Sequence, residues 1–274
     1  MKNINYILNL IPFTDYFKIV FVHFLILLLF INQISYISII IGLIWGVIVW
    51  ISFDISFHRM WSHKALTCSK IMECIFCSIN IFAGMKSAID FCGPHIWHHK
   101  YSDTEKDTYW PKGIPIWKIF VQHKSIYQNI NKIEMLRMCK HLLKNKIIKF
   151  FNNYFYLMFF SLHILIFLTN PSLIIPLISI PVVFAYMINI PGGVLLQHKW
   201  GVRICNDSSV NNKLLSYITL GLLCQHSNHH YAPGSYTFDI DKDSFDLIGV
   251  SIEMLNKINL VSIHNTNHKQ HAFD

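Results

Sequence analysis

The stretch YISIIIGLIWGVIVWISFDISFHRMWSH, residues 36–63, joins a long apolar segment to a charged, histidine-rich end. Its first 18 residues, Tyr36 to Phe53, contain no charged side chain. A helix rises about 1.5 Å per residue, so this segment covers about 27 Å, close to the bilayer's hydrocarbon thickness of roughly 30 Å. The stretch therefore predicts a membrane-spanning helix that ends in polar side chains, of which Asp54 is the first.

Three further apolar stretches extend this prediction to the whole chain. Of its 274 residues, 53% are hydrophobic and only 14% are charged, which is typical of a membrane protein. We expect an all-α integral membrane protein in which residues 1–274 form one domain. Four transmembrane helices should form two hairpins, at about 17–34, 35–56, 154–170 and 172–197. The first stretch should not be a cleaved signal peptide, because another span follows it at once.

The basic residues predict the orientation. Fifteen of the 23 lysines and arginines lie between Arg59 and Lys149. Positive charge favours the cytoplasmic side, so we expect cytoplasmic segments at about 58–153 and 198–274, in the endoplasmic reticulum or a bacterial inner membrane. The net charge of +8 is better explained by anionic lipid or an acidic partner than by nucleic acid. A basic face for an acidic electron carrier or a phosphate-bearing headgroup, or a merely solvated surface, is expected at Lys112, Lys118, Lys124 and Lys132.

Histidines form the most informative pattern in the sequence. Eight of the sixteen lie in three short clusters: HRMWSH with His58 and His63, HIWHH with His95, His98 and His99, and HSNHH with His226, His229 and His230. Helical residues three or four positions apart share a face, so each triplet can offer imidazoles to two metals. Residues five apart lie about 140° apart on an α-helix, so the first pair should serve different metals.

Metal binding explains these clusters better than burial in a core does. A lone histidine such as His23 or His163 is expected to be a packed core residue. Eight imidazoles beside a membrane need partners for their lone pairs, and neutral imidazole is a good ligand for iron, zinc and copper. A structural zinc site has four ligands and commonly includes cysteine, whereas these clusters contain none. Eight or nine nitrogens indicate two metals, and iron can activate dioxygen toward an unactivated C–H bond.

The clusters also resemble the motifs of one family, the membrane fatty acyl desaturases of the stearoyl-CoA desaturase type. HRMWSHKAL is similar to its H-R-L-x-S-H-R motif, and HIWHHKYSDTEKD to its H-R-x-H-H-x-x-S-D-T-x-x-D motif. HSNHHYAP, followed by DLIGVSIEMLNKINLV, is similar to the third motif and its trailing helix. HKWGVRICNDSSVNNKLL resembles the segment that supplies one more metal histidine, here His198. The resemblance runs from about Ser52 to Asn259.

This resemblance implies a four-helix membrane stem and a cytoplasmic helical cap that holds two iron ions. It implies oxygen-dependent desaturation of a fatty acyl substrate, acyl-CoA or acyl-lipid, near the ninth carbon. Ile190 stands where a fused haem domain would need histidine, so electrons should come from a separate b-type cytochrome or ferredoxin with its reductase. The implied catalytic iron ligands are His58, His63, His95, His98, His99, His198, His226, His229 and His230.

The chain departs from the family pattern in three places. Val194 replaces an asparagine that contacts one iron through water. Leu222 to Gln225 replace the G-E-G-W that precedes the third motif, and with it a carboxylate. Gly93 and Pro94 replace an Arg-Asp pair that meets CoA in animal enzymes. The alternatives to a desaturase are a membrane di-iron hydroxylase or other oxygenase, and a catalytically silent membrane metal-binding protein.

Several other residues have two possible roles. Asp54 either accepts the second ring N–H of His58 or reaches water at the membrane boundary. Gly42 and Gly46 either allow close helix packing or leave the end of a substrate tunnel open. The polar residues of YSDTEKD either bond ligand histidines or the substrate headgroup, or form a solvated helix end: Ser102, Asp103, Thr104, Glu105 and Asp107.

Overall fold

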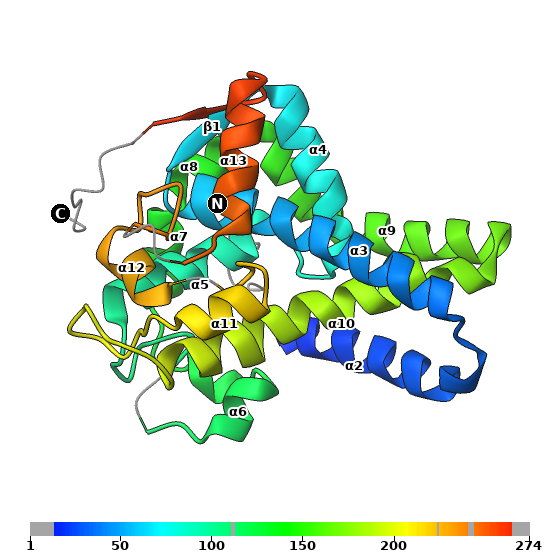
Figure 1. The fold of residues 1–274 in the computed structure, drawn as a ribbon, viewed down its shortest axis with the longest axis horizontal. Helices are drawn as coiled ribbons and strands as arrows, with labels where there is room; N and C mark the ends of the chain where they lie inside the picture. The colour runs from blue at the N-terminus through cyan, green and yellow to red at the C-terminus, as the bar shows by residue number, and fades with distance from the viewer. Residues whose placement is uncertain (1–13, 111–112, 224, 241–243, 265–274) are drawn as a thin grey trace.

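The computed structural model describes residues 14–110, 113–223, 225–240 and 244–264, and most of them are helical. Four helices extend together toward one side of the molecule (Figure 1): α2 (Thr14–Leu29), α3 (Tyr36–Phe53), α9 (Lys146–Thr169) and α10 (Ile180–Met187). Helix α10 packs against both α2 and α3. Large apolar side chains such as Ile37, Leu157 and Leu168 are exposed on these helices, as lipid contact requires.

Three helical segments are long and apolar enough to cross a membrane: Tyr36–Ser62, Lys146–Thr169 and Pro171–His198. The span expected at 17–34 is shorter than predicted. The apolar part of α2, Tyr16–Leu29, covers only about 21 Å, and the turn η1 (Ile31–Gln33) interrupts the helix. A fourth candidate is a pair of helical segments, Lys70–Ala83 and Ala88–Tyr101, that meet at an angle of 84°.

The G-x-x-x-G of α3 allows a close contact with α10. A Cβ added at Gly42 would lie 2.6 Å from the Ile180 side chain, and one at Gly46 would lie 3.2 Å from the ring of Phe184. These contacts show close helix packing, one of the two roles expected for the glycines. Their tunnel role stays a prediction.

Most of the remaining elements surround the inner ends of the long helices, but those between Pro171 and His198 belong to the same long segment as α10. The remaining elements are η2 (Asp54–Ser62), α4 (Lys70–Asn80), η3 (Ile81–Ala83), α5 (Ala88–Tyr101), α6 (Ile116–Phe120), η4 (Lys124–Tyr127), α7 (Lys132–Met138), α8 (Lys140–Lys144), η5 (Pro171–Leu173), η6 (Ile175–Ser179), η7 (Ile188–Leu195), η8 (Leu196–His198), α11 (Lys213–Ile218), α12 (His226–Tyr231) and α13 (Leu247–Lys257). Strands β1 (Leu66–Cys68) and β2 (Val261–Ile263) pair antiparallel, with Leu66 opposite Ile263. The all-α prediction missed this sheet because three-residue strands are too short to show an alternating pattern.

Candidate metal centre

Four elements from distant parts of the chain bring the nine predicted ligand histidines together. The π-helix η2 continues α3, carries His58 and is followed directly by His63, and α5 carries the HIWHH motif. Turn η8 ends at His198, and α12 begins at His226. The side chains of His98 and His229 are completely buried. The site therefore lies inside the protein, where the long helices end.

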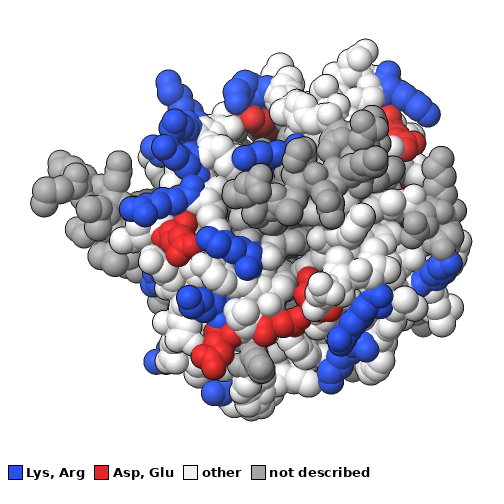
Figure 2. All heavy atoms as spheres, turned by 90° about the vertical axis from the view of Figure 1, so that its left-hand side faces the viewer, with Lys and Arg blue, Asp and Glu red and all other residues white. Residues whose placement is uncertain are grey.

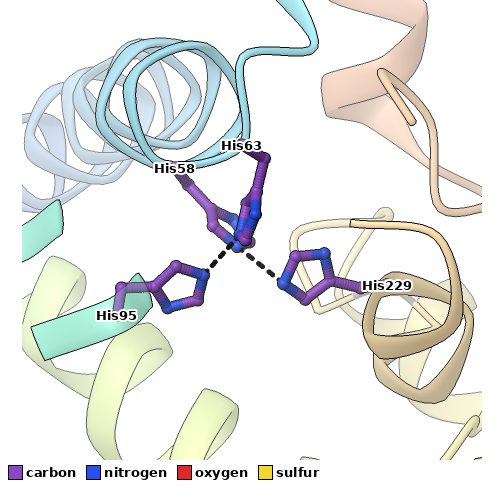
Figure 3. Close-up of side chains that lie close together, drawn as sticks. All are labelled: His58, His63, His95 and His229. Atoms are coloured by element: carbon purple, nitrogen blue, oxygen red, sulfur yellow. Dashed lines mark hydrogen bonds between the residues drawn. The ribbon is translucent and has the colours of Figure 1, made fainter. Parts of the chain in front are cut away.

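Four imidazoles form a first group: His58, His63, His95 and His229 (Figure 3). One ligand nitrogen from each lies within 4.8 Å of the others. The Nε2 atoms of His58 and His229 are 3.1 Å apart, and those of His63 and His95 are 2.7 Å apart. The Nε2 atom of His99 lies 2.8 Å from that of His229, so His99 also belongs beside this group.

Four further imidazoles, whose ligand nitrogens also lie within 4.8 Å of one another, form a second group: His98, His198, His226 and His230. The Nε2 atom of His226 lies 3.1 Å from that of His198 and 3.2 Å from that of His230. The rings of His99 and His230 stack 4.3 Å apart, so the two groups are adjacent. Together with His99, the two groups account for all nine predicted ligands.

One prediction about the grouping was wrong. His58 and His63 were expected to serve different metals, but both lie in the first group, with ring centres 5.2 Å apart. The reason is that η2 is a π-helix, in which the amide of His63 donates to the carbonyl of His58 five residues earlier. The wider turn brings residues five apart close to one face, as an α-helix would not.

Acidic or hydroxyl groups orient four of these rings through hydrogen bonds to Nδ1. Nδ1 of His58 donates to Asp54 at 3.0 Å, the bond that one reading of Asp54 required. Nδ1 of His98 lies 2.7 Å from Asp107, a member of the polar YSDTEKD set. The sequence did not point to the other two partners: Asp207 lies 2.6 Å from Nδ1 of His230, and Ser208 Oγ lies 2.9 Å from Nδ1 of His198.

These bonds determine which ring nitrogen can bind a metal. A carboxylate only accepts hydrogen bonds, so Nδ1 of His58, His98 and His230 carries the proton and Nε2 presents a lone pair. Nε2 of His98 is buried without a hydrogen-bond partner in the described part of the chain. Two nitrogens bound at about 2.1 Å to one metal and about 90° apart would be roughly 3 Å apart, which matches the separations above. The residues therefore fit two metal ions.

The electrostatics of the site favour neutral ligands. Burial holds the pKa of both His226 and His229 well below 6.5, so their imidazoles remain uncharged. Burial alone would raise the pKa of the Asp207 carboxyl, but the bond from His230 helps to lower it below its usual value. Neutral imidazole backed by an ionised carboxylate is the form in which histidine binds metals most effectively.

A buried arginine ties the first group to α13. The side chain of Arg59 is fully buried and donates to Asp54 at 2.7 Å and to both oxygens of Asp246, at 2.8 and 3.0 Å. Its guanidinium also lies 3.9 Å from the centre of the Phe238 ring, which packs against His229. Asp54 therefore links this ion network to the His58 ring.

A mostly apolar cavity of about 70 Å³ reaches both histidine groups. His58 and His95 line it from the first group, and His198 and His226 from the second. Its apolar walls include Trp50, Phe53, Val194, Leu222, Leu223 and Ile248. Neither Gly42 nor Gly46 is among the lining residues. The cavity can place an apolar chain next to both groups.

A profile of the fatty acid desaturase family matches residues 34–242. The chain belongs to the fatty acid desaturase family. It is 25% identical over 213 residues to the acyl-CoA C20 Delta5-desaturase of Anemone leveillei, which covers 76% of this chain and 67% of that protein. It is 26% identical over 216 residues to the Delta-9 desaturase-like 1 protein of Arabidopsis thaliana, which covers 75% of this chain and 69% of that protein. A shorter match, 38% identical over 50 residues, covers 18% of this chain and 15% of the acyl-CoA Delta(11) desaturase of Spodoptera littoralis.

Two departures from the desaturase pattern lie at the cavity. Val194 lines it, as do Leu222 and Leu223 of the segment that replaces G-E-G-W. Cys224, in the same segment, lies outside the described residues. The third departure lies elsewhere: a Cβ at Gly93 would meet the Met135 side chain at 3.4 Å, and the carbonyl of Pro94 accepts from Thr108.

Other histidines lie away from the site. His23 and His163 contact each other within the long helices, with Nε2 atoms 3.3 Å apart, and Ser179 bonds Nδ1 of His23 at 3.1 Å. This is the packed environment expected for them. His264 is exposed at the end of β2.

Proposed function

We propose that this desaturase family member is an oxidoreductase that introduces a double bond into a fatty acyl chain at a centre of two iron ions. The observation that carries the proposal is the convergence of nine imidazoles, five of them on buried residues, on two adjacent points beside an apolar cavity. Soft thiolates are absent from the two described groups, and neutral imidazole suits iron. All nine histidines are proposed as iron ligands.

The cavity supports the choice of substrate. An acyl chain along its apolar wall would have neighbouring methylenes close to histidines of both groups. When bound, the irons would supply, with dioxygen and two electrons, the power to remove two hydrogens and form water. The protein's own contribution is position, because the bond that reacts depends on how Trp50, Val194 and Leu223 hold the chain.

Membrane topology follows from the same proposal. The four long helices would form two hairpins, and the histidine-bearing elements a cap on the cytoplasmic side, in the endoplasmic reticulum or a bacterial inner membrane. Substrate would reach the cavity as acyl-CoA or acyl-lipid. A b-type cytochrome or ferredoxin with its reductase would supply the electrons.

Product analysis tests the proposal. The chain would be expressed in a host unable to make unsaturated fatty acids, and fatty-acid methyl esters would be read by mass spectrometry. We expect a new double bond at the ninth carbon. The matched relatives are named for the fifth, ninth and eleventh positions, so its location is itself a result. A product with an added oxygen would indicate a hydroxylase, and bound metal without product a silent metal-binding protein.

Ligand variants connect the product to the site. His98→Ala and His229→Ala should each lose bound iron and all product while still inserting into the membrane, because a missing ligand has no substitute nearby. His264→Ala, an exposed histidine outside the motifs, is the matched control and should keep both. Full activity of either ligand variant would contradict the assignment.

A further inference from the structure

The two histidine groups differ in the charged side chains that are hydrogen-bonded to their rings. In the second group, the rings of His98 and His230 donate to the carboxylates of Asp107 and Asp207. Within the described residues, neither carboxylate forms an ion pair with a lysine or arginine. In the first group, one ring, that of His58, donates to a carboxylate, and this Asp54 is also bound by Arg59 at 2.7 Å. The second group therefore has more uncompensated negative charge.

The groups also differ in how firmly their rings are oriented. The Nδ1 atoms of His95 and His229, both in the first group, are buried with no hydrogen-bond partner among the residues the structure describes. In the second group, His198 is bonded to Ser208, whose hydroxyl donates in turn to Asp103. Three of the four rings in the second group thus have a bond to Nδ1.

Both differences act on metal affinity in the same direction. A hydrogen bond from Nδ1 to a carboxylate fixes the ring and makes Nε2 more basic, and its loss typically lowers metal affinity about 10–100-fold. Two such bonds without an opposing cation favour the second group. The fifth imidazole beside the first group, His99, acts in the opposite direction, but it is a single neutral ligand.

We propose that the two metal positions are unequal, and that the group of His98, His198, His226 and His230 binds the first iron and holds it more tightly. This inference rests on the proposed di-iron function and specifies how that centre fills. Asp107 and Asp207 act through the ligand rings and are positioning residues. The first group, backed by Asp54 and Arg59, takes the second iron at higher concentration.

Anaerobic titration of the metal-free full chain with ⁵⁷Fe²⁺, followed by Mössbauer spectroscopy, tests this order. Up to one equivalent of iron, a single quadrupole doublet should grow, and a second doublet should appear only afterwards. Asp207→Asn and Asp107→Asn should lower the affinity of the first-filled position about 10–100-fold and change the parameters of its doublet. Two doublets that grow together, or a first doublet unchanged in both variants, would overturn the inference.

Controls separate this inference from loss of fold and from the proposed function. Glu134→Gln makes the same carboxylate-to-amide change at a half-exposed residue bonded to Lys100, and should bind iron as the unaltered chain does. If the aspartate variants do not fold, Ser208→Ala removes the hydroxyl that bonds both His198 and Asp103 and should still weaken the first position; unchanged binding there would refute the proposal. An unaltered chain that binds no iron pair would refute the di-iron function itself, whereas equal binding of two irons with desaturation refutes only the inequality.

Discussion

Arg59 shows how one residue connects the fold to the candidate metal centre. Its buried guanidinium is shared by Asp54 and Asp246, so removing one partner leaves charge uncompensated in the interior. Asp246→Asn keeps an oxygen that can accept from the amide of Gly249 and cap α13, but replaces the oxygen that accepts from Arg59, Thr237 and Phe238, so its effect reports on this buried network. We expect a loss of about 3 kcal/mol in stability, measured by thermal unfolding in detergent.

The matched control for this change lies on the same helix. Glu253 is exposed, and its carboxylate accepts from the hydroxyl of Tyr236. Glu253→Gln should shift the melting temperature far less, because exposed pairs contribute little. Equal shifts in the two variants would show that Arg59 does not depend on Asp246.

Histidine burial predicts the pH dependence of the metal-free protein. His226 and His229 have folded-state pKa values well below 6.5, whereas in the unfolded chain they titrate near 6.5. Below that pH the unfolded state binds more protons, so stability is full above about pH 6.5 and falls as pH decreases, by up to about 1.4 kcal/mol per pH unit for each ring. The metal-free protein should therefore melt at a lower temperature at about pH 5.5 than at about pH 7.5. A constant or rising melting temperature on acidification would contradict this.

At the scale of single residues, the sequence indicated the candidate ligand histidines but not most of their hydrogen-bond partners. The histidine motifs are local, and Asp54 lies four residues before His58, so helical spacing alone suggested their bond. Asp207 lies 23 residues before His230 in an irregular segment, and Asp246 lies 187 residues after Arg59. Such pairs depend on the tertiary fold, which no spacing rule contains.

Helix α3 offers a test of packing in the long helices. A Cβ at Gly42 would lie 2.6 Å from a side-chain carbon of Ile180, so one of the two helices must shift. Gly42→Ala should destabilise the protein by about 1–3 kcal/mol, measured as a lower melting temperature in detergent. Gly234→Ala is the control, because its Cβ would come no closer than 4.0 Å to a neighbour. A Gly42→Ala protein as stable as the control would show that α3 and α10 are not tightly packed.

Element boundaries show where hydropathy succeeds and where it fails. The span around Tyr36–Phe53 and the one at Lys146–Thr169 were predictable, because long apolar runs have few other structures available. Hydropathy could not reveal that η2 is a π-helix, since the choice between hydrogen bonds four and five residues apart depends on packing. That choice places His58 and His63 in one group.

At the scale of the whole molecule, positively charged side chains lie around the end that holds the histidine-bearing elements. Figure 2 views the molecule from that end and shows lysine and arginine side chains gathered around its rim, with fewer acidic ones between them. Lys118 on α6 and Lys124 at the start of η4 belong to the basic set expected from sequence, whereas Lys112 lies outside the described residues. Composition predicted the excess of positive charge, but where this charge lies on the surface depends on the fold.

This basic surface leads to a prediction about the electron donor. Desaturation consumes two electrons per turnover, so the purified chain with substrate and dioxygen alone should be inert. Adding a small acidic electron carrier with its reductase should restore turnover. Steady turnover without a donor would contradict the external-donor proposal.

Salt and charge reversal then test where the carrier docks. If Lys118 and Lys124 attract it, the rate at limiting carrier should fall as salt shortens the screening distance, which is roughly 8 Å at physiological ionic strength. The double variant Lys118→Glu with Lys124→Glu should reproduce the effect of high salt, by about 10-fold or more if steering dominates. Lys257→Glu combined with Lys140→Glu makes the same change in net charge on α13 and α8, at exposed positions, and should slow turnover much less. Both double variants change the net charge equally, so an equal fall in rate would reflect the electric field of the whole protein. Only a selective loss in the Lys118 and Lys124 variant would identify these residues as the docking face.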